Sequence, residues 1–256
     1  MSAVDVHTVV GGRPEAPVVV LSNSLGATHR MWDAQIGELE SRFRVVRYDT
    51  RGHGDSPVPD GPYTIDDLAD DLVALLDRLD IERAHVVGLS LGGMTAMRVA
   101  ARNPERTARI ALLCTGPHLP PPETWSQRAA QVREHGTRSV AAAVVERWFT
   151  PEYLGAHPQA RAEYERMIAV TPAEGYAGCC EAIAELDLRQ QLSTIAAPTL
   201  AIAGLDDSAT PPEMLERVVA TIPDARLLTV AQAAHLANAE QPGAVTDALI
   251  EHLERP

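Results

Sequence analysis

Short runs of apolar and β-branched residues recur along the chain, and each is bounded by residues that favour turns. Runs of this length between turn residues are typical of buried β-strands. The pattern predicts strands at residues 18–21, 43–48, 84–87, 110–114 and 199–203, and a further apolar run covers residues 225–230.

Longer segments between these runs have the apolar spacing of helices. The clearest one begins after Thr64, with Asp67 three residues later as in a capping box. Its apolar residues recur every three or four positions, at Ile65, Leu68, Leu72, Leu75, Leu76 and Leu79. Strands that alternate with helices predict an α/β fold, in which a mostly parallel sheet is covered by helices on both faces.

The alternation stops after Thr115 and resumes at Pro198. We expect a core made of residues 1–119 and 195–256, with a helical cap insertion over residues 120–194. Ligands of open α/β sheets bind beyond the carboxyl ends of the strands, where such a cap would lie. The insertion begins with three prolines and shows helix-like pieces but no evident strand, at residues 126–132, 140–148, 160–169 and 178–186.

The charge balance limits the kinds of partner. The 256 residues include 22 basic and 35 acidic side chains, for a formal net charge of −13. This charge repels polyanions, so we expect neither nucleic acid nor a membrane as a partner. A small anionic substrate would need a locally placed cation. The acidic stretch at residues 66–71 has apolar residues at helical spacing, which predicts a solvated helix face rather than a metal site.

Cysteine usage and the absence of a leader point to a cellular compartment. Cys114, Cys179 and Cys180 form no C-x-x-C pair, and no histidine cluster has the spacing of metal ligands. This pattern favours a reducing compartment and argues against zinc. The chain shows no basic leader with a long apolar stretch and no run of about 20 apolar residues. We therefore expect a soluble cytoplasmic protein that uses no metal or other cofactor. Nothing in the sequence indicates an oligomeric state.

The candidate chemistry centres on the pentapeptide Gly88-Leu89-Ser90-Leu91-Gly92, which joins a predicted strand to a predicted helix. Glycines allow a turn tight enough to expose the serine hydroxyl, as in a nucleophile elbow. The motif alone is also compatible with a glycine-rich turn that carries an incidental serine.

A serine nucleophile needs a histidine base and a carboxylate that orients the histidine. Asp206 and Asp207 follow the strand predicted at 199–203, and His235 follows the apolar run at 225–230. The order Ser, Asp, His is that of α/β-hydrolases. Taken singly, the aspartates are also compatible with a helix cap, and His235 with a plain loop residue. Their order and placement together favour a catalytic triad.

These motifs identify a resemblance. The chain resembles the α/β-hydrolase superfamily and, within it, the 3-oxoadipate enol-lactone hydrolases of the β-ketoadipate pathway. The resemblance is carried by residues 21–26, 45–54, 88–94, 203–212 and 234–238, and the predicted insertion matches poorly. The loop Ser22-Asn23-Ser24-Leu25-Gly26 and the continuation Gly93-Met94 carry more specificity than the triad motif, which occurs throughout the superfamily.

The resemblance implies an α/β-hydrolase fold and a role for several residues. It selects Asp207 over Asp206 as the triad acid, beside Ser90 and His235. The backbone N–H groups of Leu25 and Leu91 would form the oxyanion hole, and the Ser24 hydroxyl is a further candidate donor. Asp49, Arg51 and His53 would brace a turn beside the site.

The implied substrate is a small anionic lactone, so a cation should line the cap side of the pocket. Arg133 and Arg147 are the candidates, with Trp125 and Trp148 as apolar walls. Three alternatives keep the triad with another substrate: a carboxylesterase, another lactonase, or a cofactor-free perhydrolase. A fourth is a non-catalytic ligand receptor, against which the complete triad argues.

Overall fold

A seven-stranded sheet forms the centre of the protein, whose computed structural model describes residues 2–255. The strand order is β1-β3-β2-β4-β5-β6-β7. β1 pairs with β3 in antiparallel orientation, and the other neighbouring strands are parallel. The strands are β1 (Thr8–Gly12), β2 (Val18–Ser22), β3 (Arg44–Tyr48), β4 (Ala84–Leu89), β5 (Thr107–Leu113), β6 (Thr199–Gly204) and β7 (Ala225–Val230).

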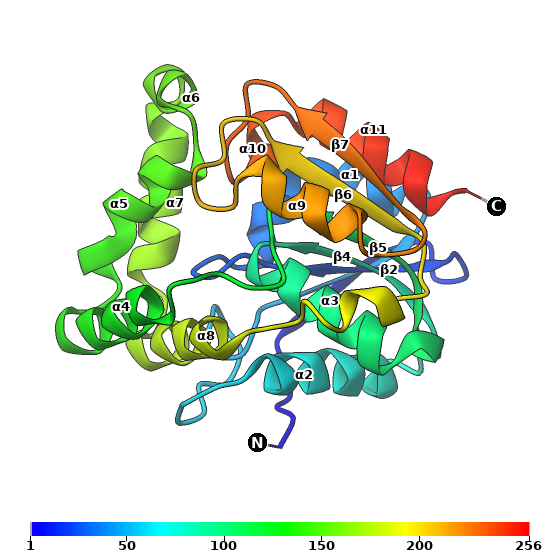
Figure 1. Cartoon of the computed structure of the whole chain (residues 1–256), viewed down its shortest axis with the longest axis horizontal. Coiled ribbons are helices and arrows are strands. Elements are labelled where there is room, and N and C mark those ends of the chain that lie inside the picture. The colour runs from blue at the N-terminus through cyan, green and yellow to red at the C-terminus, as the bar shows by residue number, and fades with distance from the viewer. Residues whose placement is uncertain (1, 256) are drawn as a thin grey trace.

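Helices cover both faces of this sheet, which confirms the expected α/β fold. Figure 1 shows α3 and α9 in front of the sheet and α1 and α11 behind it. The α-helices outside the segment between β5 and β6 are α1 (Asp33–Glu40), α2 (Ile65–Arg78), α3 (Leu91–Arg102), α9 (Pro212–Val219), α10 (Ala237–Glu240) and α11 (Pro242–Leu253). Short 3-10 helices lie at His29–Trp32, Pro104–Arg106 and Leu192–Thr194, the last of them within that segment.

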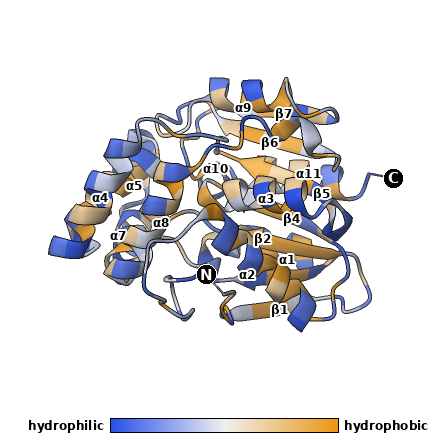
Figure 2. Ribbon diagram, turned by 60° about the horizontal axis from the view of Figure 1, so that its bottom comes forward, coloured by the Kyte–Doolittle hydropathy of each residue, from blue (hydrophilic) through white to orange (hydrophobic). Residues whose placement is uncertain are grey.

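The core lies between the sheet and these helices. β4 and β6 are buried along their whole length, as expected for central strands of a parallel sheet. Figure 2 shows the apolar residues concentrated on the strands. The sequence missed β1, an edge strand whose residues are only partly buried or exposed and which therefore lacks an apolar run.

Helix α2 begins as predicted. Thr64 Oγ1 accepts a hydrogen bond from the Asp67 N–H, and the Asp67 carboxylate accepts one from the Thr64 N–H, which completes a capping box. The cap fixes the start of the helix that carries the acidic stretch.

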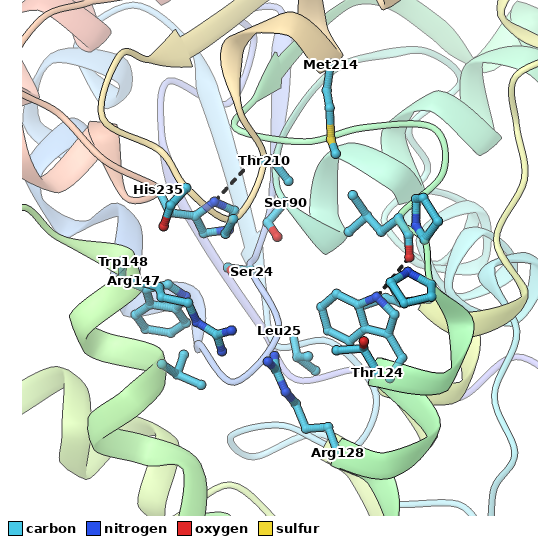
Figure 3. A pocket seen from close by; sticks show the side chains of 18 of the residues that line it. Ser24, Leu25, Ser90, Thr124, Arg128, Arg147, Trp148, Thr210, Met214 and His235 are labelled. Atoms are coloured by element: carbon cyan, nitrogen blue, oxygen red, sulfur yellow. Dashed lines mark hydrogen bonds between the residues drawn. The ribbon is translucent and has the colours of Figure 1, made fainter.

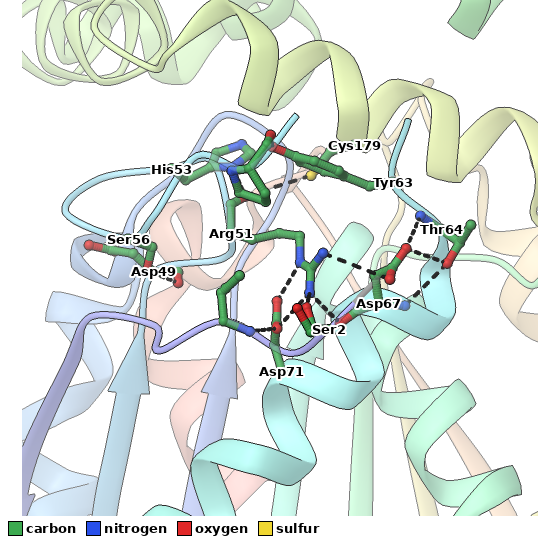
Figure 4. Close-up of polar contacts among 12 residues, drawn as sticks. Ser2, Asp49, Arg51, His53, Ser56, Tyr63, Thr64, Asp67, Asp71 and Cys179 are labelled. Atoms are coloured by element: carbon green, nitrogen blue, oxygen red, sulfur yellow. Dashed lines mark hydrogen bonds and ion pairs between the residues drawn. The ribbon is translucent and has the colours of Figure 1, made fainter. Parts of the chain in front are cut away.

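The acidic stretch differs from the solvated face that we expected. Asp67 and Asp71 are buried, and the fully buried Arg51 side chain donates to both carboxylate oxygens of Asp71, at 2.6 and 2.7 Å (Figure 4). Asp66 lies at the protein surface and pairs with Arg98. The expectation was wrong for Asp67 and Asp71 because a buried arginine from a distant loop neutralises them, which helical spacing cannot reveal.

The segment that connects β5 to β6 contains helices and loops but no strand. It contains α4 (Pro122–His135), α5 (Arg138–Trp148), α6 (Pro151–Ala156), α7 (Pro158–Ala169) and α8 (Ala173–Glu185). Figure 1 shows these five helices together on one side of the sheet. The four helix-like pieces of the sequence correspond to α4, α5, α7 and α8, and only the short α6 was not predicted. None of the helices in residues 2–255 combines the length and hydropathy needed to cross a membrane.

Candidate active site

Ser90 occupies a strained turn between β4 and α3. Its backbone has φ 56° and ψ −116°, a conformation that non-glycine residues rarely adopt. The Ser90 N–H donates to Leu113 O at 2.9 Å, and Thr115 Oγ1 donates to Ser90 O at 2.7 Å. These two bonds to β5 and its end hold the turn, so the hydroxyl points away from the sheet.

The two glycines of the motif are required by close backbone approaches. A Cβ on Gly88 would collide with the backbone of Gly92, and a Cβ on Gly92 would collide with the backbone of Ser22 at the end of β2. The glycines therefore bring the start of α3 against the loop that follows β2.

His235 and Asp207 lie on adjacent loops because β6 and β7 pair in parallel. The register pairs Gly204 with Val230, so the chain leaves both strands at the same edge. His235 Nδ1 lies 2.8 Å from Asp207 Oδ2, and both side chains are buried. Figure 3 shows the His235 ring and the Ser90 hydroxyl side by side in one cavity.

The Asp207 carboxylate is held by several donors. Its Oδ1 accepts from the N–H groups of Ala209 and Thr210, and its Oδ2 accepts from Thr210 Oγ1 at 2.6 Å. Burial acts to raise the pKa of Asp207, but His235 and the hydrogen bonds from Thr210 outweigh it and hold the pKa below its ordinary value. An ionised Asp207 accepts from His235 Nδ1–H and leaves Nε2 free as a base.

Asp206, the neighbouring candidate, is exposed, and its N–H donates to Ala233 O. The geometry therefore brings Asp207, and not Asp206, to the histidine, as the resemblance implied.

The loop after β2 carries the first expected oxyanion donor. β2 and β4 pair in parallel with Ser22 beside Gly88, which places Ser24 and Leu25 next to Ser90. Within residues 2–255, the Leu25 N–H donates to no acceptor. The Leu91 N–H is the first of helix α3 and has no intrahelical acceptor. Two free N–H groups beside Ser90 have the chemistry of an oxyanion hole.

His53 braces this loop from below. The N–H of Gly26 donates to His53 Nε2 at 2.9 Å, and the other ring nitrogen lies 3.1 Å from Arg51 O. Burial lowers the pKa of His53 against the effect of that carbonyl and of Asp49, so the ring is neutral, with its proton on Nδ1. His53 thus positions the residue after Leu25, in keeping with the bracing role expected for it.

A cavity of about 220 Å³ opens above Ser90 and His235. The predicted residues that line it are Ser24, Leu25, Trp125, Arg147 and Trp148, together with Ser90 and His235 (Figure 3). Sequence reasoning did not name several other lining residues, among them Leu119, Arg128, Tyr176, Thr210 and Met214. Because the helical segment supplies most of this wall, it covers the carboxyl ends of β4, β6 and β7.

Two guanidinium groups face the cavity, one from α4 and one from α5. Figure 3 shows Arg128 and Arg147 projecting into it from its lower side. Neither lies within ion-pair distance of a carboxylate in residues 2–255. Burial and repulsion from Arg128 lower the pKa of Arg147, which reflects a positive local potential. The Arg128 guanidinium also stacks over the Trp125 ring at 4.9 Å.

Arg133 does not line the cavity, and this corrects the expectation that it binds the substrate. It lies on the surface and pairs with Glu174 and Glu181, with four hydrogen bonds that use all three guanidinium nitrogens. These carboxylates raise the pKa of Arg133 and satisfy its charge. Arg128 takes its place at the cavity. Its signal was present in the sequence, because a residue three positions after Trp125 lies on the same helix face.

One group of side chains in residues 2–255 has the composition of a metal site. Candidate ligand atoms of His7, His29 and Asp49 lie within 4.8 Å of one another, away from the cavity wall. Asp49 Oδ1 already accepts from the His29 N–H at 2.8 Å and lies 2.9 Å from His29 Nδ1. These hydrogen bonds fasten the loop after β2 to the end of β3, which accounts for the cluster without an ion. The three cysteines are free and buried.

The sequence and the fold match known hydrolases. Residues 17–153 and 154–242 match the family described as alpha/beta hydrolase fold. The chain is 39% identical to 3-oxoadipate enol-lactonase 2 of Acinetobacter baylyi over 95% of this chain and 91% of that protein.

Solved structures agree with the sequence comparison. The enol-lactonase from Burkholderia xenovorans LB400 superposes with a TM-score of 0.96 at 40% identity, covering 98% of this chain and 96% of that one. A thermophilic esterase from Thermogutta terrifontis superposes with a TM-score of 0.93 at 31% identity, covering 98% and 93% of the two chains. The chain therefore belongs to the α/β hydrolase fold family.

Proposed function

We propose that the protein is a serine hydrolase that opens the lactone ring of 3-oxoadipate enol-lactone to give 3-oxoadipate. The observation that carries this proposal is the pair of guanidinium groups, Arg128 and Arg147, opposite Ser90 and His235 in a small cavity. A neutral ester has no use for two arginines without carboxylate partners, whereas a lactone with a carboxylate side chain would pair with them. The enol-lactonases among the similar proteins support the same substrate.

In this proposal, residues 120–194 form a cap over the core of residues 1–119 and 195–256. The core supplies the reacting groups, and the cap supplies Trp125, Arg128, Arg147 and Trp148. The unpaired cysteines favour a reducing compartment, so we assign the reaction to the cytoplasm, in the catabolism of aromatic compounds.

The first half of the reaction acylates the enzyme. His235, oriented by Asp207, takes the proton from Ser90 as its Oγ attacks the lactone carbonyl carbon. The N–H groups of Leu25 and Leu91 stabilise the negative charge on the carbonyl oxygen. Collapse of the tetrahedral intermediate breaks the ring C–O bond, and His235 gives its proton to the enol oxygen.

The second half releases the product. The enol stays attached to the acyl chain and tautomerises to a ketone. His235 then takes a proton from water, whose oxygen attacks the Ser90 ester, and the proton returns to Ser90 Oγ as the acid leaves. The cycle consumes one water, restores all three side chains and needs no cofactor chemistry.

The test compares an anionic lactone with a neutral ester. We expect the protein to consume freshly generated 3-oxoadipate enol-lactone, followed by loss of ultraviolet absorbance, with a higher kcat/KM than for p-nitrophenyl acetate. Arg128→Met and Arg147→Met should each raise KM for the lactone about 10-fold or more, since a hydrogen bond to a charged group contributes roughly 1.5–3 kcal/mol. Neutral ester hydrolysis should be unchanged.

Arg133→Met is the matched control, because that arginine is on the same helix as Arg128 and faces away from the cavity. Equal losses on both substrates in the Arg128 and Arg147 variants, or a lactone rate no better than that of the ester, would assign the protein to a carboxylesterase instead.

A further inference from the structure

Glu240 is a buried carboxylate near the active site for which the mechanism above has no use. It ends the short helix α10, five residues after His235, and only 7% of its surface is exposed. Every hydrogen bond that it accepts comes from outside α10. Its Oε1 accepts from the Thr150 N–H and from Thr150 Oγ1, both at 2.8 Å, and its Oε2 accepts from the Ala234 N–H.

These contacts join two parts of the protein that are distant in sequence. Ala234 immediately precedes His235, and Thr150 is the N-cap of α6, three residues after Arg147. On the other side of the histidine, the Leu236 N–H donates to Trp148 O at 2.8 Å. The N–H groups on both sides of His235 are thus held by residues 148–150, once directly and once through Glu240.

Such a link constrains the histidine strongly. The structure loses stability when a buried carboxylate loses its donors or when buried N–H groups lose their acceptor, because the unpaired groups are then desolvated without compensation. A displacement of residues 148–150 relative to the His235 loop would therefore break these buried hydrogen bonds. Trp148, which lines the cavity, is the first residue of that stretch, and Arg147, which also lines it, immediately precedes the stretch.

We propose that Glu240 is a positioning residue that couples residues 148–150 of the helical segment to His235. The general base is then aligned only when residues 148–150, next to Arg147, are packed against the His235 loop. The proposal rests on the assignment of His235 as the base in the proposed function, but not on the identity of the lactone. It gives the helical segment a role in catalysis besides binding the substrate.

The test uses Glu240→Gln and Thr150→Val with p-nitrophenyl acetate, a substrate that has no carboxylate for Arg147. In Glu240→Gln, an NH₂ group replaces one of the two carboxylate oxygens, so a donor of Thr150 or Ala234 loses its acceptor and faces another donor. We expect kcat to fall by about 10- to 100-fold with KM nearly unchanged, the size of loss that a small misplacement of a catalytic group produces. Thr150→Val removes one of the three donors and should cause a smaller loss in the same direction.

Two further measurements separate positioning from loss of fold. Total labelling of Ser90 by a serine-directed phosphonate counts intact sites, and kcat is expressed per labelled site. The midpoint of the acidic limb of the kcat/KM profile should move in both variants, because that limb reports on the acid–base groups of the active site and both substitutions change how those groups are held. A lower folded fraction alone cannot move that midpoint.

Thr137→Val is the matched control. Thr137 is also a buried threonine of the helical segment, and its Oγ1 donates to Thr171 O at 2.8 Å, without a link to His235. It should leave kcat and the pH profile as in the wild type. Wild-type kcat per site and an unmoved acidic limb in both Glu240→Gln and Thr150→Val would overturn the proposal. If those variants are slow with the ester while the wild type fails to open the enol-lactone, the coupling stands and the proposed substrate falls.

Discussion

At the scale of single residues, environment divides roles among side chains of the same type. Asp206 and Asp207 are neighbours, yet one is exposed and the other is buried against His235 with hydrogen bonds from Ala209 and Thr210. Arg128 and Arg133 stand on one helix, yet only Arg128 lines the cavity. In both pairs the two side chains carry the same functional group, and the three-dimensional surroundings determine which of the two reaches the cavity or His235.

The aspartate pair gives a direct prediction. Asp207→Asn should lower kcat on the order of 10⁴-fold, since an amide cannot hold the histidine in the tautomer that a general base needs. Asp206→Asn should stay within about 2-fold of the wild type, because the side chain is exposed and reaches no catalytic group. Stopped-flow or steady-state hydrolysis of a single ester suffices. A larger loss from Asp206→Asn than from Asp207→Asn would exclude our assignment of the triad acid.

At the scale of elements, the sequence predicted what local rules determine. The capping box of Thr64 and the start of α2 follow from residues three positions apart, and the buried strands follow from continuous apolar runs. β1 escaped because an edge strand needs no such run, and α6 because six residues show too little of a helical period. The candidate triad residues could be located for the same reason as the strands, because each follows a predicted strand or apolar run.

Contacts between residues that are distant in sequence could not be predicted from local patterns. Asp67 and Asp71 satisfy a helical pattern equally well as surface or as buried residues, and only Arg51, brought from the loop after β3, decides between them. Arg128 and Arg133 are five residues apart and so lie on different faces of α4. The spacing from Trp125 puts Arg128 on the face of that residue, but that this face meets the cavity depends on how α4 packs on α8 and α5.

The buried charges beneath α2 make Arg51 a prediction at this scale. Arg51→Met should lower the free energy of unfolding by about 3–5 kcal/mol, because it leaves Asp71 buried without its partner. Arg98→Met removes a comparable bidentate contact to Asp66 nearer the surface and should cost about 1 kcal/mol or less. Urea unfolding at pH 7 with a shared m-value measures both. Equal costs in the two variants would mean that burial of Arg51 adds nothing to the pair.

At the scale of the whole molecule, the local charge of the cavity is opposite in sign to the net charge of the protein. The protein carries a formal net charge of −13, yet Arg128 and Arg147 concentrate positive charge at the cavity wall. At the opposite end of β4, Arg109 lies near two histidines, His85 on β4 and His252 on α11. Both histidines are buried, His252 Nε2 lies 3.0 Å from Ile110 O, and His85 Nδ1 has no hydrogen-bond partner in residues 2–255.

These two histidines make the stability of the fold sensitive to mild acid. Burial, together with the charge of Arg109, lowers the pKa of each to about 4. An unfolded histidine titrates near pH 6.5, so the unfolded chain binds more protons between pH 6.5 and 4. The stabilisation is complete above pH 6.5 and is lost as the pH falls toward 4. By pH 5 each histidine should cost roughly 2 kcal/mol of unfolding free energy. His53, whose pKa burial also lowers, acts in the same direction.

The carboxylates cannot produce this effect in the same window. Asp207, Asp66 and Asp67 have pKa values below the ordinary one, so the stability that they contribute is lost only as the pH falls below about 4. The urea midpoint should therefore decrease between pH 7 and 5, and the decrease should be much smaller in the double variant His85→Leu, His252→Gln. Glutamine keeps a donor for Ile110 O, and leucine can pack against Phe43, whose ring lies against that of His85. The exposed His157→Gln serves as control and should retain the full decrease. If the double variant lost as much stability between pH 7 and 5 as the wild type, another group would have to be the one that takes up the protons.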